Sequence, residues 1–301
     1  MTDVMVTPSP VVIAGAGPAG MMLAYQLVAS GIPVRVLERH LDFEREFRGE
    51  VVGSSVLPVL ERLGILPILV ERGLARTDVE RSMFVGASRR VTFPSGTDQG
   101  ALISQPGLLS LLHELCGRHP SYQMDLGTAA LHAVREGERV VALDVRRDGR
   151  EERVSGDVFV ACNGRNSKLR KDLGLSVELD EKPGDTLWLR FDLSDAKDAL
   201  PSGVAVHMFG KGVVLVHFAT TRSRLQIGYS GPGDLGALRK DLVGLRAAAR
   251  IPLAHRASPV PPSRCRPSVR CVGGNVLGVL EQSGGEAHEP GRSARGRGAG
   301  P

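Results

Sequence analysis

Hydrophobic and polar positions recur with different periods along the chain, and these periods predict its secondary structure. Four consecutive apolar residues, Val11–Ala14, are typical of a short buried strand, and a helical pattern follows over residues 19–30. The segment Val34–Glu38 predicts a second strand, so the three elements form a strand–helix–strand unit of about 30 residues. Leucines at helical spacing predict two further helices, over residues 56–63 and 107–116.

Further along the chain the pattern changes to a period of two, which is typical of half-buried strands. Residues 133–161 show this pattern, with turn signals at Gly137 and at Asp148-Gly149. A second β-rich stretch over residues 187–229 contains four expected strands, at 188–191, 204–209, 213–218 and 225–229. The sequence therefore predicts an α/β fold, with a Rossmann-type βαβ unit and a mixed β-sheet unit.

The charge of the chain is concentrated near its C-terminal end. The net charge is +5, and residues 251–301 hold seven arginines and three glutamates, so this segment carries +4 and residues 1–250 carry +1. The segment is rich in Arg, Pro and Gly, has no helical or strand period, and is expected to be disordered. Because it lacks interleaved aromatic residues, we interpret it as a solvated tail and expect no nucleic-acid partner.

The remaining composition indicates a globular protein of the cytoplasm. A chain of 301 residues with 42% hydrophobic positions can bury a sizeable core. Its four cysteines show no CxxC pair and no framework of short spacings, which favours a reducing compartment. We expect neither a signal peptide nor a membrane helix, because no apolar stretch approaches about 18 residues.

A glycine-rich turn separates the first expected strand from the first expected helix. Its sequence, Gly15-Ala-Gly-Pro-Ala-Gly20, matches the GxGxxG dinucleotide pattern in the strand–turn–helix context that this pattern requires. Gly15 permits a sharp turn, Gly17 lets the backbone approach a pyrophosphate, and Gly20 lets the helix pack closely on the strand. Pro18 and Ala19 lie where a phosphate would meet the helix N-terminus. The alternative interpretation is a glycine-rich surface loop.

An acidic residue follows this turn at the expected distance. Glu38 ends the second strand, 23 residues after Gly15, where a carboxylate can accept hydrogen bonds from ribose hydroxyls. An acid at this position disfavours a 2′-phosphate, so the sequence favours FAD or NAD over NADP at this site. The next residue, Arg39, is a further candidate for contact with the nucleotide. Because the chain has one such unit, a tightly bound FAD is the preferred interpretation.

Other motifs stand in a characteristic order around this unit. They are Arg48-Gly49, Gln105–Leu109, Asp157–Arg170, Gly210–Gly212 and Leu225–Tyr229. Together with the glycine turn they resemble the motifs of the class A flavoprotein monooxygenases, the aromatic hydroxylases with the para-hydroxybenzoate hydroxylase fold. The resemblance extends from about residue 11 to residue 245.

This resemblance implies an FAD-dependent enzyme that hydroxylates an aromatic or polyketide-like small molecule with O2 and either NADH or NADPH, through a flavin hydroperoxide. It implies an FAD-binding domain formed by residues 1–80 and 100–175, interleaved with a β-rich substrate domain formed by residues 81–99 and 176–250. In such an enzyme the cofactor supplies the chemistry and the protein positions it. No metal is implied, no catalytic side chain is assigned, and the oligomeric state is left open.

The resemblance also implies roles for residues outside the glycine turn. Arg48 and Gln105 would contact the phosphates or the ribityl chain of FAD; a surface ion pair and a helix cap are their alternative roles. Asn163 and Gly164 match the family's Asp-Gly pair, with an amide in place of the acid, which can form hydrogen bonds but adds no charge.

Four residues of the second β-rich stretch are candidates for lining a substrate pocket. Trp188 and Arg190 share one face of an expected strand, and His207 and His217 lie on neighbouring strands. Ordinary packing within the sheet is the alternative interpretation for all four.

The C-terminal part of the chain departs from the family pattern. The family's Gly-Asp segment, which contacts the flavin, should fall after residue 250, and the stretch around Glu286 only weakly resembles it. We therefore expect a truncated or frameshifted C-terminus, with a catalytically impaired FAD-binding remnant as the alternative function. A flavin-dependent reductase or halogenase is a third hypothesis.

Overall fold

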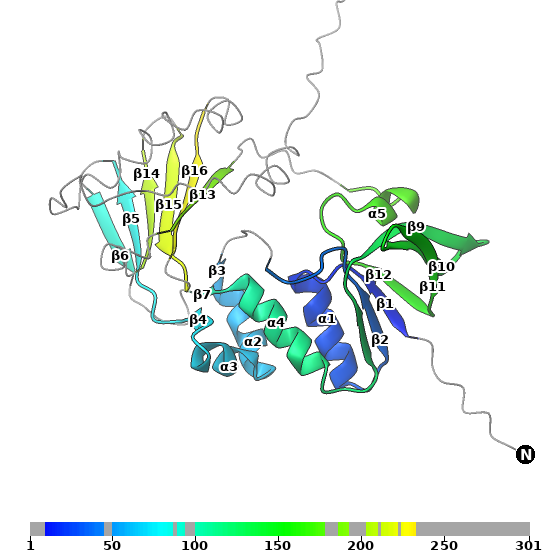
Figure 1. Cartoon of the computed structure of the whole chain (residues 1–301). Helices are drawn as coiled ribbons and strands as arrows, with labels where there is room; N and C mark the ends of the chain where they lie inside the picture. The colour runs from blue at the N-terminus through cyan, green and yellow to red at the C-terminus, as the bar shows by residue number, and fades with distance from the viewer. Residues whose placement is uncertain are drawn as a thin grey trace, which may run out of the picture.

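The computed structural model contains two larger units of β-structure joined by a small sheet (Figure 1). The structure describes residues 10–44, 50–86, 89–93, 100–177, 186–192, 203–209, 212–221 and 224–232. The expected tail after residue 250 and the stretch around Glu286 lie outside these residues.

A four-stranded parallel sheet forms the base of the first unit. Its strand order is β12-β1-β2-β8, and all three neighbouring pairs are parallel. The central strand β1 is almost entirely buried because both faces of the sheet are covered, which explains its unbroken apolar run. The helix α1 (Pro18–Ala29) connects β1 to β2, and this confirms the expected strand–helix–strand unit. The strands are β1 (Val11–Ala14), β2 (Val34–Leu37), β8 (Tyr122–Asp125) and β12 (Val158–Ala161).

One face of the parallel sheet is covered by α1, and α4 (Gln105–Cys116) packs on α1. Beside α4 lie α3 (Ile65–Glu71) and then α2 (Leu57–Arg62), which follows a 3-10 turn η1 (Ser54–Val56). The expected helices correspond to α2 and α4, whereas α3 was not predicted. Seven residues of α4 are buried, because its leucines recur on the side that faces α1 and the sheet. No helix within the described residues is long and apolar enough to cross a bilayer.

An antiparallel meander covers the opposite face of the parallel sheet. It consists of β9 (Thr128–Glu136), β10 (Arg139–Arg147) and β11 (Arg150–Ser155), and the short helix α5 (Lys168–Asp172) packs on β9. Asp148 and Gly149 both have positive φ, as a two-residue hairpin between β10 and β11 requires. The apolar contact joins Val12, Ala14 and Leu37 of the parallel sheet to Leu143, Val145 and Val154 of the meander.

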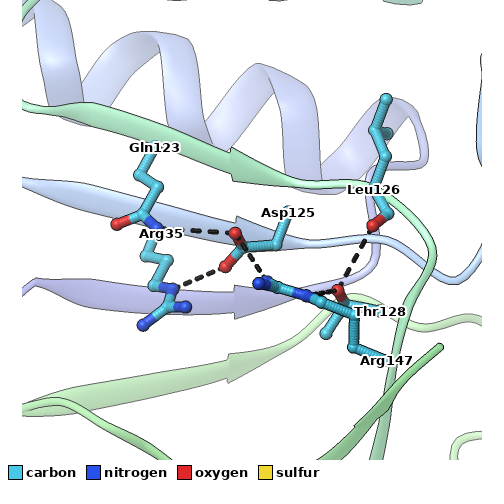
Figure 2. A network of polar contacts seen from close by, with 6 residues as sticks. All are labelled: Arg35, Gln123, Asp125, Leu126, Thr128 and Arg147. Carbon is cyan, nitrogen blue, oxygen red and sulfur yellow. Dashed lines mark hydrogen bonds and ion pairs between the residues drawn. The ribbon is translucent and has the colours of Figure 1, made fainter. Parts of the chain in front are cut away.

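A polar network also connects the parallel sheet to the meander (Figure 2). The Asp125 carboxylate on β8 is 8% exposed and accepts a hydrogen bond from Arg35 Nε on β2 at 2.6 Å. Arg147 on β10 approaches the same carboxylate from the other side, with its Nη2 2.7 Å from Asp125 Oδ1, and its Nε donates to Thr128 Oγ1. Two guanidinium groups thus replace the water that this buried carboxylate loses on folding.

The second large unit is a six-stranded sheet of order β13-β16-β15-β14-β5-β6. β5 and β14 pair in parallel and all other neighbours pair antiparallel. Two distant stretches of chain therefore build one sheet, which lies to the side of the parallel sheet in Figure 1. Its strands are β5 (Arg81–Val85), β6 (Arg89–Phe93), β13 (Thr186–Asp192), β14 (Val204–Met208), β15 (Val214–Ala219) and β16 (Arg224–Ser230).

A small sheet lies between the two large units. It is formed by β3 (Val51–Val52), β4 (Ala75–Arg76) and β7 (Ala101–Ile103), with β7 in the centre. The backbone N–H of Thr221, at the end of the six-stranded sheet, donates to Glu50 Oε2 beside β3 at 3.2 Å. The six-stranded sheet also packs on this region through one apolar cluster, formed by Val51, Val79, Leu102, Trp188, Val204, Val216 and Phe218.

Candidate functional site

Three loops meet at the carboxyl ends of neighbouring parallel strands. The glycine turn follows β1, Glu38 follows β2, and Asn163 lies just after β12. Backbone hydrogen bonds hold the loops together, since Gly15 N–H donates to the Leu37 carbonyl at 2.8 Å and Cys162 N–H donates to the Ala14 carbonyl at 2.8 Å. Open α/β sheets bind their ligands at this edge, where loops from adjacent strands converge.

The three glycines of the turn differ in their steric surroundings. Gly15 has φ +106°, and a Cβ there would lie 2.5 Å from the Cys162 carbonyl oxygen. A Cβ at Gly20 would collide with the Gly15 carbonyl oxygen, so this glycine permits α1 to pack closely on β1. A Cβ at Gly17 would meet no atom within 4 Å, and the φ of Gly17, −74°, is open to any residue. The protein itself therefore does not require glycine at this position. Gly17 therefore borders free space, on the side where the ligand was expected.

The N-terminus of α1 faces the same space. Gly17 is the N-cap residue, no side chain caps the helix, and Pro18 occupies the first turn. Pro18 and Ala19 are exposed, whereas Gly20 is buried. An uncapped helix N-terminus presents backbone N–H groups and the positive end of the helix dipole, which together bind a phosphate anion.

Glu38 is 3% exposed and is held in place by backbone groups. Its Oε2 accepts a hydrogen bond from Ala16 N–H at 2.8 Å, and its Oε1 accepts one from His40 N–H at 2.9 Å. The Glu38 backbone itself bonds to Asp125 and Thr128, which fixes the end of β2. One carboxylate has about four acceptor positions, so Glu38 can order the glycine turn and still accept from a hydroxyl group.

Asn163 and Gly164 complete this edge of the sheet. A Cβ at Gly15 would lie 2.8 Å from the Asn163 Cα, so the Asn163 backbone directly borders the glycine turn. The Asn163 Oδ1 atom is buried and has no hydrogen-bond partner among the described residues. Gly164, the next residue, has φ +91°, a backbone conformation that glycine adopts more readily than other residues.

An adenine dinucleotide fits these residues. The free space at Gly17 and the uncapped helix suit its pyrophosphate, and Glu38 offers an acceptor for its ribose hydroxyls. The unpaired Asn163 Oδ1 offers another acceptor, and an unpaired buried acceptor is costly unless a ligand or water satisfies it.

Three further residues, Arg39, Arg48 and Gln105, are candidates for contact with the cofactor. Gln105 is half-buried at the first position of α4, where the cap is Ser104, whose Oγ accepts from Gly107 N–H at 3.3 Å. The side chain that caps α4 is therefore that of Ser104, and not that of Gln105. Arg39 is exposed, with its Nε 3.1 Å from His40 Nε2. Arg48 lies outside the described residues.

The two cysteines within the described residues are free thiols, and only Cys162 borders the glycine turn. Burial raises the pKa of Cys162, which lies against the glycine turn, and raises that of Cys116 to about 12. A thiol with a raised pKa stays protonated and is a poor nucleophile. Within the described residues, no group of three or more His, Cys, Asp or Glu side chains forms a metal site.

Three of the four substrate-pocket candidates are placed by the structure, and they divide between the two faces of the six-stranded sheet. Trp188 lies on the face that packs against the small sheet, with its ring edge-on to Phe218 at a centroid distance of 6.3 Å. The backbone of Arg190 pairs with Gln226 of β16, and the side chain of Arg190 lies outside the described part of the structure. His207 and His217 lie on the opposite face, so the structure separates them from Trp188.

His207 and His217 form a half-buried pair on that opposite face. Their Nε2 atoms are 3.0 Å apart, so one ring donates a hydrogen bond and the other accepts it. Burial lowers the pKa of both, and that of His217 falls to about 4 with a further contribution from His207. The His207 ring is stacked near Phe84 and Phe209, at centroid distances of 4.5 and 6.0 Å. At neutral pH the pair therefore packs as uncharged rings.

Two polar residues near the small sheet were not predicted from the sequence. Glu50 is 7% exposed and binds Thr221 N–H, and Gln226 is 3% exposed on the same face as Trp188. The signal for Gln226 was its position in the expected strand over 225–229, but its neighbours depend on how three strands align. That alignment is a tertiary property.

The comparisons with known proteins agree with the geometry. The family described as the FAD binding domain matches residues 8–211. The 6-methylpretetramide 4-monooxygenase of Streptomyces rimosus is 33% identical over 193 residues, which cover 60% of this chain and 44% of that protein. The rifampicin monooxygenase of Streptomyces venezuelae is 25% identical over 198 residues, which cover 64% of this chain and 39% of that protein.

Solved structures share the fold. PqsL of Pseudomonas aeruginosa, described as a probable FAD-dependent monooxygenase, has a TM-score of 0.65 at 22% identity, over 81% of this chain and 66% of that chain. The myxobacterial halogenase CndH has a TM-score of 0.67 at 18% identity, over 80% of this chain and 56% of that chain. The chain spans less than half the length of the curated relatives that it matches.

Proposed function

The chain belongs to the family of FAD-binding domains, and from this premise we propose that it is an FAD-dependent monooxygenase of aromatic or polyketide-like small molecules. The observation that supports it most is the edge of the parallel sheet, where Gly17, Glu38 and Asn163 offer free space and acceptors at the carboxyl ends of adjacent strands. The names of the related monooxygenases supply the class of reaction.

The proposed reaction inserts one atom of O2 into a C–H bond of the substrate. NADH or NADPH supplies two electrons as a hydride and becomes NAD⁺ or NADP⁺. The other oxygen atom leaves as water, formed with this hydrogen and one proton from solvent. When bound, FAD supplies the redox chemistry that links these partners.

The residues of the chain bind and orient the cofactor. The N-terminus of α1 holds the pyrophosphate, with Gly17 allowing its close approach. Glu38 orders the glycine turn and accepts from the adenosine ribose, and Asn163 accepts from a hydroxyl of the cofactor. Arg39, Arg48 and Gln105 are further proposed contacts.

We propose that the two units divide the work. Residues 1–80 and 100–175 form the FAD-binding domain, and residues 81–99 and 176–250 form the substrate domain. The substrate is a small aromatic molecule that lies against the six-stranded sheet, on the face that carries Trp188. We propose the cytoplasm as the location, because NADH and NADPH are supplied there.

The test is to purify the full chain, measure FAD per chain after denaturation, and follow NADH and NADPH oxidation with a panel of phenols. We expect about one FAD per chain, and oxidation that an aromatic substrate stimulates, with one labelled oxygen in the product when 18O2 is used. A chain that takes up no added FAD contradicts the proposal. A chain that binds FAD but never turns over with any phenol supports the impaired FAD-binding remnant instead.

A further inference from the structure

The six-stranded sheet has one face that meets the first unit, and Gln226 lies on it. Strand alternation places Gln226 on the same side of the sheet as its paired neighbour Phe218 on β15. Phe218 packs with Leu102 of the small sheet, so this is the side turned toward the first unit. Because β16 lies between β13 and β15, Gln226 is in the interior of the sheet.

The Gln226 side chain is buried but incompletely bonded. It is 3% exposed, and its Oε1 atom is buried without a hydrogen-bond partner among the described residues. Other polar side chains of this face have partners: Thr186 and Ser230, further along the same strands, share a hydrogen bond of 2.6 Å. Arg190 pairs with Gln226 across the two strands, but its side chain lies outside the described part of the structure. Because buried acceptors in folded proteins are nearly always satisfied, we expect Gln226 Oε1 to bind a donor that the described residues do not supply.

An aromatic side chain lies next to this acceptor. Trp188 pairs with Gly228, two residues from Gln226 and on the same face. A Cβ at Gly228 would lie 3.0 Å from two carbons of the Trp188 ring, so the glycine lets the indole lie directly over the strand. The face thus combines an aromatic side chain with one acceptor that has no partner among the described residues, two groups that can bind a planar ring and orient it through one polar contact.

We propose that Gln226 Oε1 accepts a hydrogen bond from a phenolic hydroxyl of the substrate, whose ring lies near Trp188. This proposal rests on the proposed function, since it assumes that the aromatic substrate binds this face. It makes the substrate a phenol with a free hydroxyl and Gln226 a specificity-determining residue. Hydrogen bonding to Gln226 also leaves more electron density on the phenolic oxygen, and so on the ring carbons ortho and para to it, where hydroxylation of an electron-rich ring takes place.

The test compares 2-hydroxyanthraquinone with 2-methoxyanthraquinone, a pair in which only the first has the donor. Trp188 is the single tryptophan of the chain, so quenching of its fluorescence reports binding at this face, and equilibrium dialysis checks the affinity. We expect the FAD-loaded wild-type chain to bind the hydroxy compound about 10-fold more tightly, as one neutral hydrogen bond allows. In Gln226→Leu this preference should fall to less than about 2-fold, through weaker binding of the hydroxy compound alone.

Gln26→Leu is the matched control, because Gln26 is exposed on α1 and bonds only locally to the Met22 carbonyl. It should leave both affinities unchanged. A preference that persists in Gln226→Leu, or its absence in a wild-type chain that binds either compound, overturns the proposal.

A second measurement needs no ligand. If Gln226 Oε1 is unpaired without ligand, as it is among the described residues, replacing the amide by leucine should leave the melting temperature of the ligand-free protein unchanged or raise it. A clear fall means that the amide already has a protein partner, which overturns the proposal even if neither anthraquinone binds. Failure of the proposed function has a different signature, since it appears as loss of FAD binding or of turnover in the same samples.

Discussion

The parallel sheet and the six-stranded sheet differ in the kind of group that each offers to a ligand. At the parallel sheet the proposed binding groups are backbone N–H groups and glycines that lie within one short stretch of sequence, supported by Glu38. At the six-stranded sheet the proposed binding groups are the side chains of Trp188 and Gln226, which come together only through strand pairing. The first arrangement suits a ligand part common to many enzymes, and the second suits a ligand that differs from one enzyme to the next.

Gly20→Ala should have the largest effect and tests whether backbone packing controls the first region. A Cβ at residue 20 collides with the Gly15 carbonyl, so we expect a loss of about 3 kcal/mol in unfolding free energy, together with loss of FAD binding. Chemical denaturation of the apo chain measures the first effect. Gly53→Ala is the control, because Gly53 has an ordinary φ of −66° and a Cβ there has no contact closer than 4.0 Å. Equal stability of the two variants would contradict the packing role.

Asp125→Asn tests the connection between the parallel sheet and the meander shown in Figure 2. Removing the charge leaves Arg35 and Arg147 without their shared carboxylate, and we expect the unfolding free energy to fall by about 2 kcal/mol. Urea denaturation measures this change. Glu114→Gln removes a fully exposed partner of Arg72 and should cause no measurable loss. If both variants lose the same stability, burial of the Asp125 network is not its source.

Gly17→Ala separates ligand binding from folding within the first region. A Cβ there meets no protein atom within 4 Å, so the unfolding free energy of the apo chain should not change. The methyl group would occupy the space expected for the pyrophosphate, and the affinity for FAD should fall by more than about 10-fold, or 1.4 kcal/mol. Isothermal titration of the apo chain with FAD measures the affinity. Unchanged affinity would show that the ligand does not approach Gly17.

The smallest effect concerns the far face of the six-stranded sheet, where His217 is paired with His207. Burial depresses the folded pKa of His217 to about 4 from 6.5, so the unfolded chain binds more protons between these values. The contribution of His217 to stability is therefore complete above about pH 6.5 and is lost as the pH falls through its folded pKa. We expect His217→Phe to flatten the decrease in melting temperature between pH 6.5 and 4. His113, whose pKa burial also lowers, retains its own contribution in both proteins. An unchanged pH profile would contradict burial of the pair.

Much of the parallel-sheet region could be predicted because its signals are local. The run Val11–Ala14, the glycine turn and Glu38 lie within 28 residues and correspond to β1, the start of α1 and the end of β2. The hairpin at Asp148-Gly149 was likewise predicted from its turn residues, since their positive φ depends on those residues alone. The helix α3 was missed, because it begins directly after Gly64 and continues the apolar pattern of α2.

The six-stranded sheet could be predicted only in part. Its four later strands were expected from their period, but a period does not reveal which strand pairs with which. Trp188 and His217 were both candidates for one pocket, and only the register places them on opposite faces. The position of Gln226 in a strand was expected, but its lack of a partner among the described residues was not, because that depends on the strands that surround it.

The sequence by itself determined the strand–helix–strand unit, the steric need for glycine at residues 15 and 20, and the acid at residue 38. These features depend on backbone geometry and on contacts between residues close in the chain. The tertiary structure decided that Asn163 borders Gly15 and that β5 joins β14. It also decided that Gln226 lies buried beside the strand of Trp188. Such contacts join residues far apart in the chain, and they form because the whole fold buries its apolar surface, which no short stretch of sequence specifies.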